Sequence, residues 1–292
     1  MSRSVMLCAA LLCAMEVTTT ARPGDDRIGD DRIVGEVRHP LRLELEGAVP
    51  FDGSDPQATA VARQMYGGMF RWVEASRIWL KAPDDGFEQM AVQLSKDRNC
   101  DQNCLYAVLF HDDRNWLELW RGRASALHLG PIGPEGLRGI HDGVRLWSWV
   151  GGAYRPGLRE YRFDYRAMKP QERTSIETAL AEMSAAGDAE TRYAVLDFPV
   201  NDGVGAIVSV TSLTYCGQLV CPVFVLDKTA QIVGRFQSIE GQSGAALERD
   251  ASGNPMIETL AVNGLVVYRI GDTMPVFTIS AQRPIIAGRE RQ

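Results

Sequence analysis

Two pairs of closely spaced cysteines are the clearest candidates for chemistry in this sequence. Cys100 and Cys104 flank a short loop ahead of an apolar stretch, and Cys216 and Cys221 do the same later in the chain. In an oxidising compartment, such locally paired cysteines predict disulfides. The alternative is a metal or redox site, but zinc sites usually show Cys-x2-Cys spacing and nearby histidines, and no histidine follows His141. We therefore expect two structural disulfides, with no bound metal and no cofactor.

Two polar clusters match catalytic motifs only in part. His111-Asp112-Asp113 is the densest, but neighbouring side chains of an extended chain diverge, so a turn is the simpler interpretation. Gly241-Gln-Ser-Gly244 resembles the turn around the nucleophile of trypsin-like proteases. Here Gln242 stands where that family has an acid, and every histidine lies in the first half of the chain. We predict a loop at each place and no catalytic residue.

The tryptophans are confined to the first half of the chain, where two expected strand faces carry aromatic side chains at alternating positions. Such a face either fills a core or stacks against sugar rings or a partner protein. Core packing is favoured by Tyr268 and Ile270, which stand at equivalent places later in the chain. If a surface there binds a ligand, the candidate residues are Trp116, Glu118, Trp120, Arg121, Arg123, Trp147 and Trp149.

Residues 1–21 have the form of a secretory signal peptide. Arg3 precedes a short apolar stretch that includes Cys8 and Cys13, and small residues lead to a cleavage site after Ala21. The apolar stretch is too short for a permanent membrane span, so we expect no integral membrane segment in the mature chain. These features predict a periplasmic or secreted protein.

The charge balance restricts the class of partner. The formal net charge is −6, and removal of the signal peptide leaves it unchanged because one base and one acid are lost. A mildly acidic exterior is poorly suited to nucleic acid and favours a basic partner. With 45% hydrophobic residues the chain is globular.

The same series of elements is expected twice along the chain. Residues 22–40 form a flexible acidic lead-in that contains a tandem charged repeat. Residues 41–46 alternate as a strand and precede a helix that starts at Asp55-Pro56. Residues 161–165 again alternate as a strand before a helix that opens at Lys169-Pro170. The second cysteine pair follows its helix at nearly the same distance as the first.

These regularities predict an α+β protein built from two tandem copies of one unit, residues 41–158 and 159–283, followed by a C-terminal tail at 284–292. Each copy would consist of a mainly antiparallel sheet with one packed helix and a hairpin tied by a local disulfide. The strands expected in the second copy are residues 193–198, 206–214, 222–226, 231–236 and 265–270.

The second cysteine pair also carries a family resemblance. Cys-Gly-x-x-x-Cys-Pro from Cys216, then Val-Phe-Val-Leu to Leu226, and later Asn263-Gly264 before an aromatic strand resemble short β-rich repeats of uncharacterised secreted proteobacterial proteins. The resemblance is looser to periplasmic lysozyme inhibitors, which are small, disulfide-tied and insert an exposed loop into an enzyme cleft. This resemblance implies a binding or envelope protein and names no ligand.

Three functions are consistent with the sequence. The first is an exported binding protein that contacts a glycan or a protein of the cell envelope. The second is an inhibitor of a basic lytic enzyme such as lysozyme, which the acidic charge permits. The third is a hydrolase of envelope polymers, which we disfavour because no nucleophile, base and orienting group converge in the sequence.

Overall fold

The computed structural model describes residues 45–81, 88–96, 100, 103–159, 165–184, 190–200 and 203–289. All of them belong to one compact unit, residues 33–292. The predicted signal peptide, the lead-in, residues 41–44 of the first expected strand and residues 161–164 of the second lie outside the described residues. Leu45 and Glu46, which complete the first expected strand, lie outside the strands.

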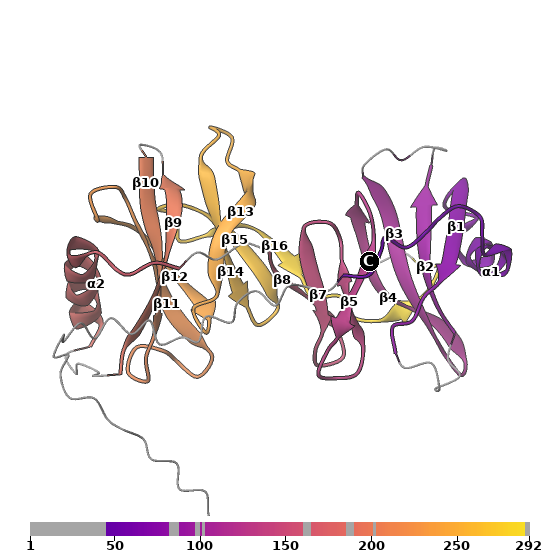
Figure 1. The fold of residues 1–292 in the computed structure, drawn as a ribbon, viewed down its shortest axis with the longest axis horizontal. Coiled ribbons are helices and arrows are strands. Elements are labelled where there is room, and N and C mark those ends of the chain that lie inside the picture. The colour runs from indigo at the N-terminus through magenta and orange to yellow at the C-terminus, as the bar shows by residue number, and fades with distance from the viewer. Residues whose placement is uncertain are drawn as a thin grey trace, which may run out of the picture. The chain divides into compact units, whose positions relative to one another are not determined.

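The elements follow one another in a simple order, labelled in Figure 1. The first series is α1 (Pro56–Tyr66), β1 (Trp72–Arg77), β2 (Gln89–Ser95), β3 (Cys104–Asp112), β4 (Asn115–Ala124), β5 (His128–Ile132), β6 (Arg138–His141), β7 (Arg145–Trp149) and β8 (Tyr154–Arg159). The second is α2 (Pro170–Met183), β9 (Arg192–Val200), β10 (Gly203–Thr211), β11 (Val220–Leu226), β12 (Ile232–Ile239), β13 (Ser243–Arg249), β14 (Pro255–Ala261), β15 (Gly264–Arg269), β16 (Pro275–Ser280) and β17 (Ile285–Ile286).

The described strands form four antiparallel sheets, so the predicted α+β architecture is wrong. The sheet orders are β1-β2-β3-β4-β17, β5-β6-β7-β8, β12-β11-β10-β9 and β13-β14-β15-β16. The protein is mostly β, and it is not two tandem copies of one sheet with one helix. The strands predicted for the second half do not include β13, β14 or β16.

A second sheet covers the face that the prediction left to solvent. The buried aromatic side chains of β4 and β7 lie in one cluster, which therefore sits between the first two sheets. Phe198 of β9 and Ile257 of β14 belong to a second buried cluster, which lies between the β9–β12 sheet and the β13–β16 sheet. Cys221 to Leu226 of β11 are all buried, as a strand covered on both faces requires.

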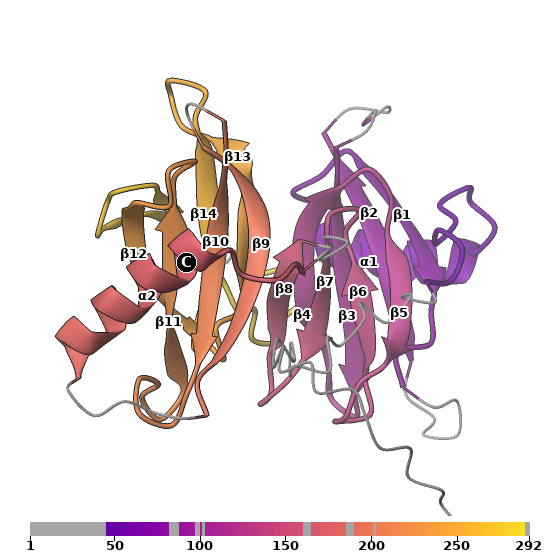
Figure 2. The same cartoon turned by 60° about the vertical axis from the view of Figure 1, so that its left-hand side comes forward.

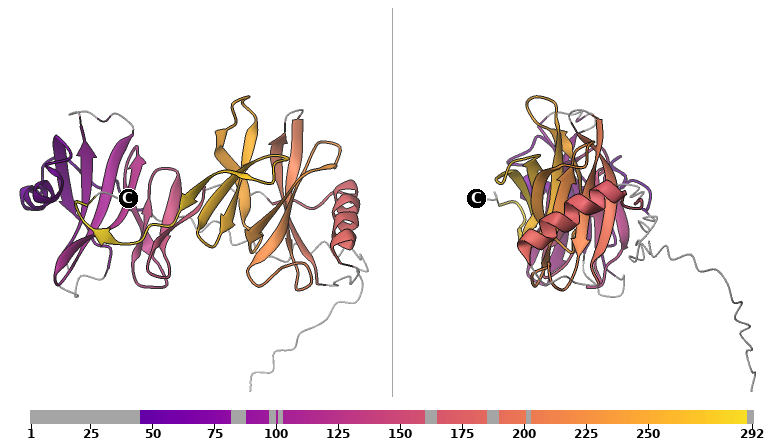
Figure 3. Two further views of the ribbon diagram at one scale, coloured as in Figure 1. Left: turned by 180° about the vertical axis from the view of Figure 1, so that it is seen from behind. Right: turned by 90° about the vertical axis from the view of Figure 1, so that its left-hand side faces the viewer.

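Each helix covers the remaining face of one sheet. Helix α1 begins at Pro56, as predicted, because the Asp55 carboxylate accepts a hydrogen bond from the Ala58 N–H. Its Thr59 hydroxyl exchanges hydrogen bonds with the backbone of Ala75 on β1, which satisfies part of the edge of that strand. Helix α2 lies across the strands of the β9–β12 sheet (Figure 3, right) and buries Ile176 and Leu180 against it.

An ion-pair network holds the start of α2. The Glu172 carboxylate accepts two hydrogen bonds from the Arg166 guanidinium, at 2.7 and 2.8 Å, and one from the Lys169 backbone N–H at 2.8 Å. Arg166 also binds Asp197 on β9 at 2.6 Å. Burial alone would raise the pKa of Glu172, but the bonds from Arg166 and Lys169 outweigh it and hold the pKa below its ordinary value.

We expect this network to weaken as the solution becomes acidic. Because the folded-state pKa of Glu172 is lowered, its contribution is complete above the unfolded-state value near 4.5 and is lost as the pH falls through the folded-state value. Chemical unfolding measured from pH 7 to pH 3 should therefore show a smaller acid-induced loss of stability in Glu172→Gln than in the wild type. An identical pH dependence in both proteins would contradict this assignment.

The last described residues return to the first sheet instead of forming a free tail. Ile285 and Ile286 of β17 pair with Glu118 and Leu117 of β4 respectively, and the yellow segment in Figure 3 (left) follows this path. Gly288 packs so closely that a β-carbon would lie 2.7 Å from the Met65 carbonyl oxygen, and its φ of +80° also favours glycine. The carboxyl-terminal segment therefore belongs to the fold of the first half.

Candidate functional site

The predicted ligand-binding tryptophans are divided between core and surface. Trp120 and Trp147 are buried and meet edge to face, with ring centroids 5.9 Å apart, at the centre of the core between the first two sheets. Trp116 and Trp149 are half-buried, and each packs against a second ring, that of His111 and that of Tyr154 respectively. Most of the side-chain surface of these four tryptophans is therefore used for packing inside the protein.

Glu118 and Arg121 belong to a buried polar network. The Tyr66 hydroxyl donates to the Glu118 carboxylate at 2.6 Å, and Arg121 Nη2 donates to the same oxygen at 2.5 Å. Burial and then the negative charge of Glu118 raise the pKa of the Tyr66 phenol. The network joins α1 to β4 and leaves the Glu118 carboxylate inaccessible to a ligand. Arg123 is exposed, and its guanidinium binds the Asn103 carbonyl oxygen at 3.0 Å.

The other polar clusters have structural contacts. The Asp112 carboxylate accepts hydrogen bonds from the Arg114 and Asn115 N–H groups in the turn between β3 and β4, which lowers its pKa. Ser243 is buried, and its hydroxyl lies 3.3 Å from the Gly241 carbonyl oxygen and 3.2 Å from the Ser209 hydroxyl. The turn predicted for residues 111–113 is only partly correct, because His111 and Asp112 end β3 and the turn itself is Asp113-Arg114; the loop predicted for residues 241–244 likewise ends at Gln242, and β13 begins at Ser243.

Both predicted disulfides are present. The Cα atoms of Cys100 and Cys104 lie 4.9 Å apart, and those of Cys216 and Cys221 lie 4.2 Å apart. Cys104 is buried in the core between the first two sheets. The second disulfide instead closes residues 216–221 at the surface, and we call residues 212–221, which lead from β10 into the start of β11, the disulfide loop.

The disulfide loop exposes two large apolar side chains. Leu213 is 89% exposed and Leu219 is 60% exposed, and both line a pocket of about 390 Å³ beside the disulfide. Its charged lining residues are Glu190, Arg192 and Glu240, so acidic groups outnumber basic ones. An exposed apolar pair with a polar rim is typical of a protein-binding surface.

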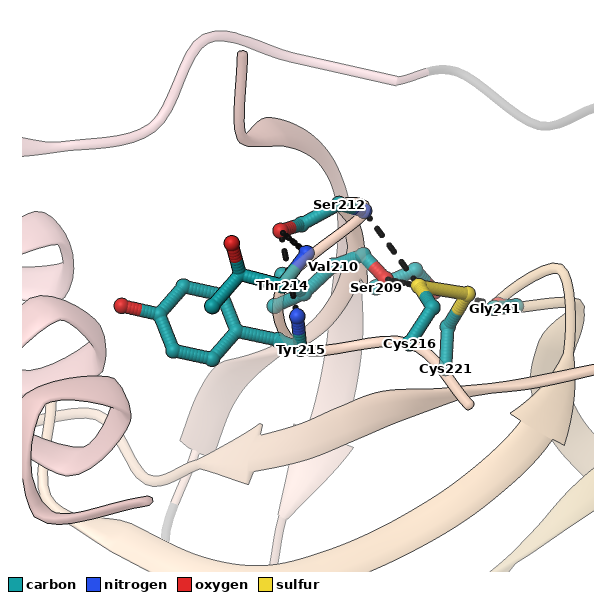
Figure 4. Close-up of a disulfide and its surroundings, with 8 residues drawn as sticks. All are labelled: Ser209, Val210, Ser212, Thr214, Tyr215, Cys216, Cys221 and Gly241. Atoms are coloured by element: carbon teal, nitrogen blue, oxygen red, sulfur yellow. Dashed lines mark hydrogen bonds between the residues drawn. A yellow bond between two sulfur atoms is a disulfide. The ribbon is translucent and has the colours of Figure 1, made fainter. Parts of the chain in front are cut away.

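Hydrogen bonds fix the path of the loop (Figure 4). The Ser212 hydroxyl accepts hydrogen bonds from the N–H groups of Thr214 and Tyr215, at 3.1 and 3.2 Å, and the Ser212 carbonyl accepts one from Cys216 at 3.0 Å. Gly217 N–H donates to the Val220 carbonyl at 2.8 Å. With the disulfide, these bonds hold the loop in one conformation before any partner arrives.

Tyr215 anchors the loop to the body of the protein. In Figure 4 its ring points away from the disulfide, and it packs against the core formed by α2 and the β9–β12 sheet. Leu213, two residues earlier, contributes almost nothing to that core because most of its surface is exposed. The loop thus buries one apolar residue for stability and leaves two others accessible.

The neighbouring turn carries backbone strain beside the pocket. Glu240 has a φ of +49° and Gly241 a φ of +69°, and Gln242 N–H donates to the Ile239 carbonyl at 2.8 Å, which defines a type I′ turn. That turn favours asparagine or glycine at the position of Glu240, so glutamate costs on the order of 1 kcal/mol there. Glu240 N–H also donates to the Leu219 carbonyl at 3.3 Å, which joins the turn to the loop.

The sequence contained a signal for this site. Leu213 and Leu219 interrupt a stretch of serine, threonine, glycine and cysteine, where no periodicity assigns leucine to a core face. Because the sequence prediction treats this segment only as a disulfide-tied connection between two strands, it assigns no role to the two leucines. The predicted strand 206–214 also extended too far, because β10 ends at Thr211.

The described residues contain no group of three or more His, Cys, Asp or Glu side chains able to hold a metal ion. Among those residues no helix is both long and apolar enough to cross a membrane. No protein-family model matches the chain, and comparisons with curated proteins and with solved structures found no significant match.

Proposed function

We propose that the protein is an exported binding protein that docks on a partner protein through its disulfide loop. The observation that carries the proposal is the exposure of Leu213 and Leu219 on a loop held by a disulfide and by its own hydrogen bonds. A loop that is already ordered loses little conformational freedom on binding, so the two leucines can contribute most of their burial energy to affinity.

Charge and compartment define the partner further. The acidic excess around the pocket and the net charge of −6 favour a partner whose docking surface is basic around an apolar centre. Two disulfides are consistent with an extracellular or periplasmic address. Inhibition of a basic lytic enzyme is one form of this proposal, and lysozyme is therefore the first purified partner to assay.

Site-directed photocrosslinking in the producing cells tests the proposal. A photoreactive amino acid at position 213 should form a discrete adduct with one protein, and the same group at Val204 should not. Val204 is a matched control because it is 62% exposed at the opposite end of β10. The captured protein is then purified and its affinity for the wild type and for Leu213→Asp is measured by calorimetry.

We expect Leu213→Asp to weaken this complex by at least about fivefold, since central apolar contacts typically contribute more than 1 kcal/mol. Val204→Asp should bind as the wild type does. Identical adducts from positions 213 and 204, or equal affinities for wild type and Leu213→Asp, would rule out the disulfide loop as the docking element.

A further inference from the structure

Trp79 is a second exposed feature that packing does not explain. It follows β1 at the edge of the first sheet and is 58% exposed, whereas the other five tryptophans are buried or half-buried. Within the described residues it takes part in no hydrogen bond and no ring contact. Tryptophan is enriched among the residues that dominate binding surfaces, so an exposed one is a candidate for contact with another molecule.

A cleft lies at the end of β1, two residues before this tryptophan along the chain. Its volume is about 510 Å³, and it is lined by Pro50, Ser54, Asp55, Pro56, Gln57, Ser76 and Arg77. Burial alternates from Arg77 to Leu80, so Arg77 and Trp79 project to the same exposed side of an extended segment. Two residues span about 7 Å along such a segment, so the Trp79 Cα lies about that far beyond the Cα of Arg77, which lines the cleft.

The polar groups of the cleft are fixed in position. Arg77 Nη2 donates to Gln57 Oε1 at 2.7 Å, and the Arg77 backbone N–H donates to Asp55 Oδ2 at 3.3 Å. Asp55 is itself held by its capping bond to α1. Arg77 Nε also lies 3.6 Å from Asp55 Oδ2, as an ion pair. The Gln57 amide hydrogens and the other guanidinium hydrogens make no hydrogen bond among the described residues, and they are available as oriented donors.

The charges of the lining restrict the ligand. Arg77 and Asp55 are the charged lining residues, and they compensate each other, so the cleft selects neither an anion nor a cation. A ligand that matches the site has an apolar face that stacks on the indole. It also has several hydroxyl groups that hydrogen-bond to the planar guanidinium of Arg77 and the planar amide of Gln57. We propose that Trp79, Arg77 and Gln57 form a binding site for a neutral saccharide, with a pyranose ring stacked on Trp79.

Tryptophan fluorescence with acrylamide quenching tests this site, because the quencher reaches an exposed indole far more readily than a buried one. Neutral tetrasaccharides of glucose and of N-acetylglucosamine are the probes, and an acidic tetrasaccharide of galacturonate is the comparison. We expect one of the neutral probes to protect the wild type from quenching at millimolar concentrations. Gln57→Ala should weaken that probe about fivefold, as expected for a lost hydrogen bond of about 1 kcal/mol.

The role of Trp79 is tested separately by calorimetric titration, which needs no indole signal. Trp79→Ala should abolish binding of the probe, and Trp149→Phe, which removes a half-buried indole, should leave the affinity unchanged. Thermal unfolding confirms that both variants fold. Absence of binding by every neutral probe up to about 10 mM, or unchanged binding in Trp79→Ala, would overturn the assignment. The disulfide loop is not involved, so either proposal can fail alone.

Discussion

Glu258→Leu is expected to lower the free energy of unfolding by about 3–5 kcal/mol, the largest effect of any single substitution we predict. The Arg145 guanidinium and the Glu258 carboxylate form a buried ion pair at 3.2 Å, and both side chains are at most 5% exposed. Without Glu258, the guanidinium keeps, among the described residues, one hydrogen bond, a long one of 3.3 Å to the Gly157 carbonyl oxygen. A buried positive charge is then left without compensation.

Urea denaturation measures this loss, and the double variant Arg145→Met/Glu258→Leu identifies its cause. Because the double variant removes both charges, it should recover most of the stability. Glu182→Leu is the matched control, since Glu182 pairs with Arg235 at 3.4 Å where both side chains are more than half exposed. It should change stability by less than about 1 kcal/mol. Equal losses in the single and double variants would refute the ion-pair explanation.

A chain that ends at Ala281 is expected to lose about 4 kcal/mol of stability. The side chain of Gln282 accepts a hydrogen bond from the Arg121 N–H at 2.7 Å and donates one to the Arg121 carbonyl at 2.8 Å. Its backbone exchanges two more with Tyr154, and Ala287 N–H donates to the Trp116 carbonyl. Gln282 thus pairs with β4 through its side chain and with β8 through its backbone. Truncation leaves the backbone groups of Arg121 and Tyr154 without these partners.

Tryptophan fluorescence is the appropriate probe of the truncation, because all six tryptophans lie between residues 72 and 149. The midpoint of urea unfolding followed by fluorescence should fall. Gln282→Ala alone should cost about 2 kcal/mol, while Arg283→Ala, at an exposed neighbouring position, should cost less than about 0.5 kcal/mol. A truncated protein as stable as the wild type would show that the carboxyl-terminal segment is dispensable.

Local features of the fold were predictable from the sequence. The starts of both helices followed from Asp55-Pro56 and Lys169-Pro170, because capping and proline act within a few residues. Both disulfides followed from short spacing, since two cysteines four or five residues apart are already close.

The layers were not predicted, although one signal for them was present. The run from Cys221 to Leu226 is apolar without alternation, which is typical of a strand buried on both faces. A single helix covers only one face, so this run already required a second layer. Strand β13 was missed because alanine, glycine and charged residues dominate it, and β17 is only two residues long.

The candidate sites were the least predictable part. The alternation of Trp116, Glu118 and Trp120 indicates a strand, but it does not say which sheet face is covered. Burial of Glu118 depends on Tyr66 and Arg121, which approach it only in the folded chain. Leu213 and Trp79 are exposed because no element covers them, and that is a property of the whole arrangement of sheets and helices.

The shortness of the disulfide loop has a practical consequence for anyone who produces this protein. A bridge between residues five positions apart contributes about 2 kcal/mol, so the cores of the four sheets do not depend on it. Material in which this bridge is reduced is therefore expected to give a normal circular dichroism spectrum and to melt cooperatively. It would nevertheless present a loop that only its hydrogen bonds restrain. A negative binding assay therefore has meaning only when mass spectrometry has shown that Cys216 and Cys221 are oxidised.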